Sequence, residues 1–248
     1  MEPDQRYWFD VQGYLVLKNV LSPALVNDLN RILDAYETKD PAAYPSPLAL
    51  GRERDEHQLY LSNVVEADPA LHPLIDLPAV LPIIKEVSLG LFRLNHTYAL
   101  YHWGGAYTRM HMGGAPLHPK AAYSCRNGEI FSLLTKAVYP LLNHRVEDGC
   151  FAVIPGSHKA NFPLPADRAA TEKALVPIPA DPGDAIIFTE ALTHGSFINQ
   201  SGRPRRTLYF CYSVGYMPDW TKYKLHFSDA LYARVSDAQR EVLRLKVD

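Results

Sequence analysis

Two histidines and an arginine are the side chains of this 248-residue chain whose types and spacing best suit chemistry. His194 follows His111 by 83 positions, and Arg205 follows His194 by eleven. Neutral imidazole is a good ligand for iron and other transition metals. The planar guanidinium of arginine binds a carboxylate through two parallel hydrogen bonds. The pattern therefore predicts a metal site beside an anion site, on a scaffold rigid enough to bring distant histidines together.

The elements that must position these residues are mostly short strands. From Phe92 onward, β-branched or aromatic segments alternate with Gly and Pro turns, which is typical of a sandwich, barrel or jelly roll. Ser22 and Pro23 together predict the start of a helix, as N-cap and first helical residue. Residues 42–60 are rich in proline and charge, and we expect them to form a lid over the site. The expected strands are 13–17, 95–101, 131–141, 150–154, 185–188 and 207–214.

Composition excludes several classes of protein. The chain is 47% apolar with a formal net charge of -2, as expected for an ordinary globular protein. It has no apolar run near the roughly 20 residues that span a bilayer, and no long basic run for a nucleic acid polymer. We therefore expect a cytoplasmic protein that contacts neither membrane nor nucleic acid.

Several motifs, in a fixed order, resemble one enzyme family. They are the segments 10–17, 149–159 and 183–188, then His194-Gly195-Ser196, then Arg203-Pro204-Arg205-Arg206. Over about residues 9–216 the chain is similar to the phytanoyl-CoA dioxygenase-like family of iron(II)- and 2-oxoglutarate-dependent enzymes.

The resemblance implies a mainly β fold with flanking helices, built on a double-stranded β-helix of the jelly-roll or cupin type. One domain, 1–248, would then comprise a helical shoulder at about 22–90, a jelly-roll core at about 92–216 and a C-terminal helix at about 229–246. His111 and His194 would be the metal ligands. Iron(II), 2-oxoglutarate and molecular oxygen would be the cofactor and co-substrates.

The same resemblance places the remote carboxylate of 2-oxoglutarate on Arg205. Arg203 is the nearby alternative, because residues two apart on a strand share a face. Arg206 would point the other way. Ser196 could add a hydroxyl donor, and Thr135 and Tyr139 on the predicted strand 131–141 are further candidates.

Gly113 is where the chain departs from the family, which has a carboxylate two residues after the first histidine. The favoured interpretation is a halogenase with a His-x-Gly motif, in which chloride takes the vacated position at Gly113. The second is a hydroxylase whose third ligand is water or a carboxylate from elsewhere, such as Glu129 or Glu190. The third is a non-catalytic relative that binds a small acid.

The chain's modest size favours a free small-molecule substrate. Basic residues and aromatic residues alternate near the metal motif, which suits a phosphorylated, ring-containing compound such as a deoxyadenosine phosphate. These are Arg109, Lys120, Arg126 and Lys136, with Tyr101, Trp103, Tyr107 and Tyr123.

Overall fold

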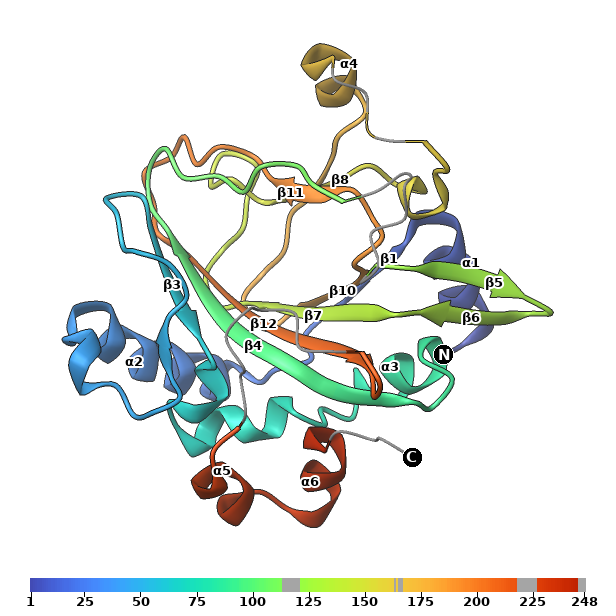
Figure 1. The fold of residues 1–248 in the computed structure, drawn as a ribbon. Helices are drawn as coiled ribbons and strands as arrows, with labels where there is room; N and C mark the ends of the chain where they lie inside the picture. The colour runs from blue at the N-terminus through green and yellow to red at the C-terminus, as the bar shows by residue number, and fades with distance from the viewer. Residues whose placement is uncertain (113–120, 163, 165–166, 218–226, 245–248) are drawn as a thin grey trace.

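Two antiparallel sheets form the centre of the computed structural model, which describes residues 1–112, 121–162, 164, 167–217 and 227–244 (Figure 1). The large sheet has the strand order β1-β10-β7-β12-β4-β3-β2 and the small one β11-β8-β9. The large sheet contains β1 (Tyr14–Leu17), β2 (Ala49–Leu50), β3 (Gln58–Ser62), β4 (Phe92–His102), β7 (Leu134–Pro140), β10 (Ala185–Thr189) and β12 (Arg205–Val214). The small sheet contains β8 (Phe151–Val153), β9 (Val176–Ile178) and β11 (His194–Ser196), and β5 (Tyr123–Arg126) pairs with β6 (Glu129–Ser132) in a separate hairpin. This arrangement confirms the predicted jelly-roll class.

The space between the sheets is filled by side chains from both of them. Phe151 and Val153 of β8 pack with Val138, Ile186 and Phe188 of the large sheet. Because successive residues of a strand point to opposite faces, the alternate residues of β7 and β10 lie on the outer face. The inner face of the large sheet contacts the small sheet, and its outer face contacts the helices. Only side chains on the inner face can therefore enter the space between the sheets.

Helices cover the outer face of the large sheet (Figure 1). The longest, α2 (Pro23–Thr38), begins at the predicted residue, since Ser22 Oγ accepts the Leu25 N–H at 3.2 Å. Its apolar face packs on the sheet through Leu29 and Leu33. The other helices are α1 (Pro3–Gln12), α3 (Leu81–Val87), α5 (Asp229–Arg234), α6 (Asp237–Leu243) and α4 (Arg168–Lys173), of which α4 lies on the opposite side, beyond the small sheet (Figure 1). Short 3-10 turns are η1 (Pro41–Ala43), η2 (Val64–Glu66), η3 (Pro69–Leu74) and η4 (Ser157–Lys159).

Two expected boundaries are wrong. The C-terminal range contains two helices, because Val235 is extended and Ser236 caps a new helix by accepting the Gln239 N–H. The expected shoulder at 22–90 also contributes β2 and β3, which add to the edge of the large sheet. The last residues of the lid expected at 42–60 therefore belong to the large sheet, because β3 pairs with β4. No helix in the described ranges is long and apolar enough to cross a membrane.

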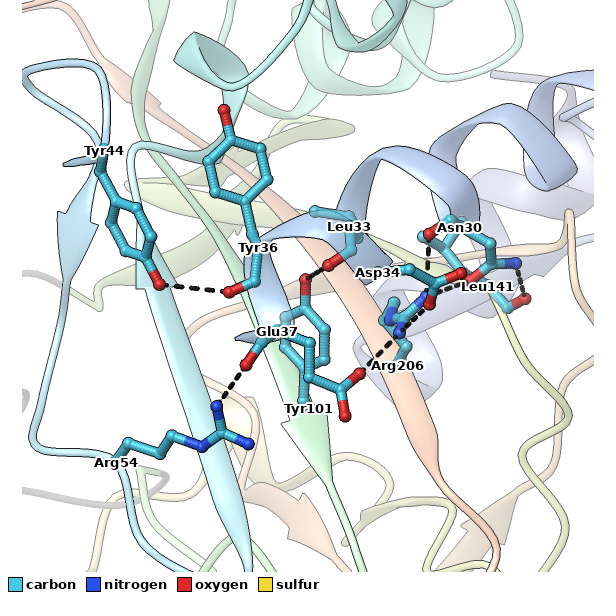
Figure 2. Close-up of polar contacts among 10 residues, drawn as sticks. All are labelled: Asn30, Leu33, Asp34, Tyr36, Glu37, Tyr44, Arg54, Tyr101, Leu141 and Arg206. Atoms are coloured by element: carbon cyan, nitrogen blue, oxygen red, sulfur yellow. Dashed lines mark hydrogen bonds and ion pairs between the residues drawn. The ribbon is translucent and has the colours of Figure 1, made fainter. Parts of the chain in front are cut away.

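Arg206 of β12 attaches α2 to the outer face of the sheet (Figure 2). Its guanidinium pairs with Asp34 at 2.7 Å and Glu37 at 3.1 Å, and it lies 4.7 Å from the centroid of the Tyr101 ring. The Arg206 side chain is 7% exposed, whereas that of Asp34 is 66% exposed. The cation is thus the buried member of this network.

We expect Arg206→Met to lower the free energy of unfolding by about 3 kcal/mol, from lost hydrogen bonds to charged groups and lost cation–π contact. Asp34→Asn should have a much smaller effect, because exposed ion pairs contribute little. Urea denaturation of both variants measures the difference. Equal losses would mean that the buried cation does not dominate the network.

Candidate active site

His111 and His194 lie side by side at the edge of the small sheet. The His111 N–H donates to the His194 carbonyl at 3.0 Å, and the His194 N–H donates back at 3.1 Å. Side chains directly opposite each other in an antiparallel pair share a face, and the two ring centroids are 4.1 Å apart. Backbone pairing across 83 residues of sequence therefore brings both imidazoles to one place.

Both imidazoles are oriented by backbone carbonyls. Nδ1 of His111 lies 2.8 Å from the Arg109 oxygen, and Nδ1 of His194 lies 2.7 Å from the Leu192 oxygen. A carbonyl can only accept, so each Nδ1 carries the hydrogen and each Nε2 keeps a free lone pair. Metal-binding histidines are typically fixed by this kind of contact.

The two rings are neutral, as a metal ligand must be. Burial lowers the pKa of His111, and the nearby ammonium of Lys136 acts in the same direction. Burial also holds the pKa of His194 well below its ordinary value, with further contributions from His111 and Lys136. Neither ring needs to lose a proton before binding a metal at neutral pH.

Glu190 is the third potential ligand. One ligand atom from each of His111, Glu190 and His194 lies within 4.8 Å of the others. Oε2 of Glu190 is 3.9 Å from Nε2 of His194 and 2.7 Å from Nζ of Lys136. Two imidazoles and a carboxylate are the donor set that non-haem iron(II) oxygenases use. The residues therefore fit an iron(II) ion.

Arg205 is a buried cation without an acidic partner. Its guanidinium donates to the Gly149 carbonyl and to Nδ1 of His102, and lies 3.3 Å from Oγ of Ser196. Arg205 is 4% exposed, and within the described residues no carboxylate pairs with it and its Nε has no hydrogen-bond partner. Burying an unpaired charge is costly. The site is consequently suited to an anion supplied from outside.

Ser196 and Arg205 form the two sides of this anion site. Ser196 Oγ accepts the Thr108 N–H at 2.7 Å, so its own hydroxyl hydrogen remains available to a ligand. Ser196 lies two residues beyond His194 on β11, on the same face and about 7 Å along the strand. A short dicarboxylic acid such as 2-oxoglutarate can therefore bind a metal at one end and Arg205 at the other.

His102 has a role that the sequence did not indicate. Its Nδ1 accepts from Arg205, its cross-strand neighbour on β12. Burial, followed by the charge of Arg205, lowers the pKa of His102 to about 3. The neutral ring fixes the guanidinium without pairing its charge. Only the strand register, which is not visible in the sequence, could have revealed this contact.

Thr135 and Tyr139 do not face the site, so their assignment to the co-substrate was wrong. Tyr139 lies in the outer core, 5.9 Å between ring centroids from Phe210. Thr135 Oγ1 donates to Ser132 on the same side. Neighbouring residues of a strand lie on opposite faces, so Lys136 and Val138 are on the inner face of β7. Lys136 is thus the side chain that enters the site.

Arg203 is also placed away from the anion site. The strand begins at Arg205, so Arg203 lies in the preceding loop, with its side chain 59% exposed and paired with Glu147 and Asp148. The expectation that Arg203 shares the face of Arg205 was therefore wrong.

The remaining predicted residues do not form one surface. Gly113 and Lys120 lie outside the described residues. Glu129 is exposed in the hairpin and is not in the metal cluster. Tyr101 donates to the Leu33 carbonyl on the outer face (Figure 2). Of the basic and aromatic residues expected around the substrate, Lys136 contacts the metal cluster through its side chain and Arg109 through its backbone carbonyl.

An aromatic wall adjoins the cluster on the inner face. Tyr98 and Tyr209 stack with ring centroids 4.3 Å apart, and Tyr60 stacks on Tyr98 at 4.9 Å. Nζ of Lys136 lies 5.9 Å from the centroid of the Tyr98 ring. Flat rings and a cation thus extend from the candidate metal ligands toward β3.

The family follows from this site and from a match over most of the chain. A family model described as phytanoyl-CoA dioxygenase (PhyH) matches residues 9–207. The chain belongs to this family. The expected resemblance is confirmed. The chain differs from the family in having Gly113, not a carboxylate residue, two residues after His111.

Curated relatives are named dioxygenases. Dioxygenase lolE1 of Epichloe uncinata is 32% identical over 105 residues, which are 40% of this chain and 40% of that protein. Dioxygenase trt7 of Aspergillus terreus is 27% identical over 212 residues, 79% of this chain and 68% of the relative. The first alignment thus spans less than half of its relative.

Solved structures share the fold. HygX of Streptomyces hygroscopicus, determined with nickel and 2-oxoglutarate bound, has a TM-score of 0.77 at 23% identity, covering 92% of this chain and 93% of HygX. The epimerase SnoN, with Fe3+, alpha ketoglutarate and nogalamycin RO, has a TM-score of 0.65 at 17% identity, covering 90% and 88%.

Proposed function

We propose that this protein is an iron(II)- and 2-oxoglutarate-dependent oxygenase that hydroxylates a free small molecule. The proposal rests on one observation. The His111 and His194 rings lie together, and near them is the buried guanidinium of Arg205, which pairs with no carboxylate among the described residues. A metal-binding pair alone or a buried arginine alone would be less specific. Together, at a spacing that suits a short 2-oxo diacid, they match one kind of co-substrate.

Each residue has a defined task in this proposal. His111 and His194 hold iron(II) through Nε2, and Arg205 with Ser196 binds the remote carboxylate of 2-oxoglutarate. Bound iron(II), 2-oxoglutarate and molecular oxygen supply the oxidant for an unactivated carbon. Phe188 and Phe151 shield the His194 ring from water, since they pack against it at 4.6 and 5.9 Å between centroids.

The aromatic wall of Tyr60, Tyr98 and Tyr209 supports a substrate with a planar ring, which would stack on it. HygX and SnoN have been solved with hygromycin B and with nogalamycin RO bound, respectively, so the fold accommodates small organic ligands. A phosphorylated, ring-containing compound remains one of the candidate substrates.

Halogenation is the second candidate, and Gly113 favours it. A glycine two residues after His111 has no side chain to bind the metal, and an exogenous chloride would fill the position. Glu190 argues for hydroxylation instead, because a carboxylate already lies beside both histidines. The relatives' names agree with oxygenation.

The product of turnover separates the two candidates. A panel of ring-containing metabolites and nucleoside phosphates is incubated with iron(II), 2-oxoglutarate, saturating chloride and 18O-labelled oxygen gas. We expect succinate formation coupled to one substrate, whose product contains a single labelled oxygen atom. A chlorinated product would establish the halogenase, and tight ligand binding without 2-oxoglutarate consumption would favour the non-catalytic relative.

A further inference from the structure

Glu190 occupies an unusual place for a metal-binding carboxylate. It directly follows β10 and precedes His194 by four residues, whereas the family's carboxylate follows the first histidine. The backbone holds it firmly, since the Glu190 N–H donates to the Leu134 carbonyl at 2.9 Å. The Leu192 N–H donates to the Thr189 carbonyl at 3.0 Å, which closes the turn between the two strands. This turn directs Glu190 and His194 toward the same point.

The Glu190 carboxylate is buried but incompletely satisfied. The residue is 1% exposed, and its Oε2 pairs with the ammonium of Lys136 at 2.7 Å. A carboxylate can accept about four hydrogen bonds, so one ion pair leaves lone pairs of the buried group unused. The same oxygen lies 3.9 Å from Nε2 of His194. Its free lone pair and its position are those of a metal ligand.

Lys136 pairs with the carboxylate and holds it in place. Its ammonium is 6% exposed and comes from β7, the strand next to β10. It balances the Glu190 charge when no metal is bound, because a buried carboxylate is stable only when paired. With a metal present, the same contact would orient the ligand from behind, as the outer partners of metal ligands commonly do.

We infer that Glu190 supplies the metal-binding carboxylate that Gly113 cannot supply, and that Lys136 positions it. The site would then be a facial triad of two histidines and one carboxylate, in which the carboxylate comes from the end of β10. This inference rests on the proposed function and favours hydroxylation within it, because the third protein position is occupied and unavailable to chloride.

Three variants test the inference without relying on turnover. Glu190→Gln removes the ligand charge, Lys136→Met removes its partner, and the double variant removes both, so that no unpaired charge remains buried. The affinity for iron(II) is measured anaerobically by competition with a chromophoric chelator, and cobalt(II) absorption reports the donor set.

We expect Glu190→Gln and the double variant to bind metal at least about 100-fold more weakly, since losing even an outer partner of a ligand costs about 10–100-fold. Lys136→Met should keep a carboxylate-containing cobalt(II) spectrum. Wild-type metal affinity and an unchanged spectrum in the double variant would overturn the inference.

Asp184→Asn is the matched control. Asp184 is likewise 1% exposed and pairs with Lys18 at 2.6 Å, but it precedes β10 at the strand's other end. It should change thermal stability and leave metal affinity unaltered. His111→Ala and His194→Ala separate a failure of the Glu190 inference from a failure of the proposed function. If they lose metal while the Glu190 variants keep it, only this inference fails; if all retain metal, the proposed function fails as well.

Discussion

Replacing His194 with alanine should abolish the visible charge-transfer band that iron(II) and 2-oxoglutarate give in the anaerobic wild-type protein. The band arises only when the 2-oxo acid chelates bound iron, and His194 is one of two imidazoles whose Nε2 is free for that metal. His111→Ala should have the same effect. The loss should be complete under conditions that saturate the wild type, because one remaining imidazole leaves an incomplete site.

His72→Ala provides the control for this experiment. His72 is also a buried histidine, but it belongs to η3 in the helical layer. Its replacement should lower stability and leave the band intact. Full retention of the band in both His111→Ala and His194→Ala would rule out the site.

Replacing Arg205 with lysine should weaken 2-oxoglutarate binding by about 10–100-fold, corresponding to one lost hydrogen bond to a charged group of about 1.5–3 kcal/mol. Lysine keeps the charge but cannot make two parallel hydrogen bonds to a carboxylate. Arg205 lies beside Ser196, not beside the metal cluster, so iron(II) affinity measured without 2-oxoglutarate should change little. Titration of each ligand separately gives this comparison.

Arg203→Lys and Arg206→Lys are neighbouring controls in the same segment. Arg203 is exposed and paired with Glu147, and Arg206 is bound to α2 on the opposite face. Both changes should leave 2-oxoglutarate affinity near that of the wild type. If Arg205→Lys leaves 2-oxoglutarate affinity unchanged and Arg203→Lys lowers it, Arg203 is the residue that binds the remote carboxylate.

Local sequence predicted several of the elements, and residue types and order named the candidate site residues. Ser22 and Pro23 located the start of α2 because capping depends on neighbouring residues only. Alternating apolar segments separated by turns predicted the strands of the jelly roll. The histidines and Arg205 were proposed from residue type and order, and the fold brings His111 and His194 together.

Strand faces and register required the tertiary structure. Thr135 and Tyr139 were predicted to line the site, but Lys136 does so, since a strand's two faces differ by one residue and both faces of β7 are buried. Sequence alternation identifies an inner face only when the other face is polar. The contact between His102 and Arg205 likewise depends on pairing between β4 and β12, 103 residues apart.

The sequence by itself determined that this protein has a histidine pair, an arginine and a glycine where a carboxylate was expected. It favoured chloride at the third position and left water or a carboxylate such as Glu129 or Glu190 as the alternative. The tertiary structure separated the two acids, because the turn after β10 directs Glu190 toward His194 while Glu129 lies in an exposed hairpin. The deciding distances arise from backbone pairing between segments far apart in the chain, and residue spacing carries no information about those distances.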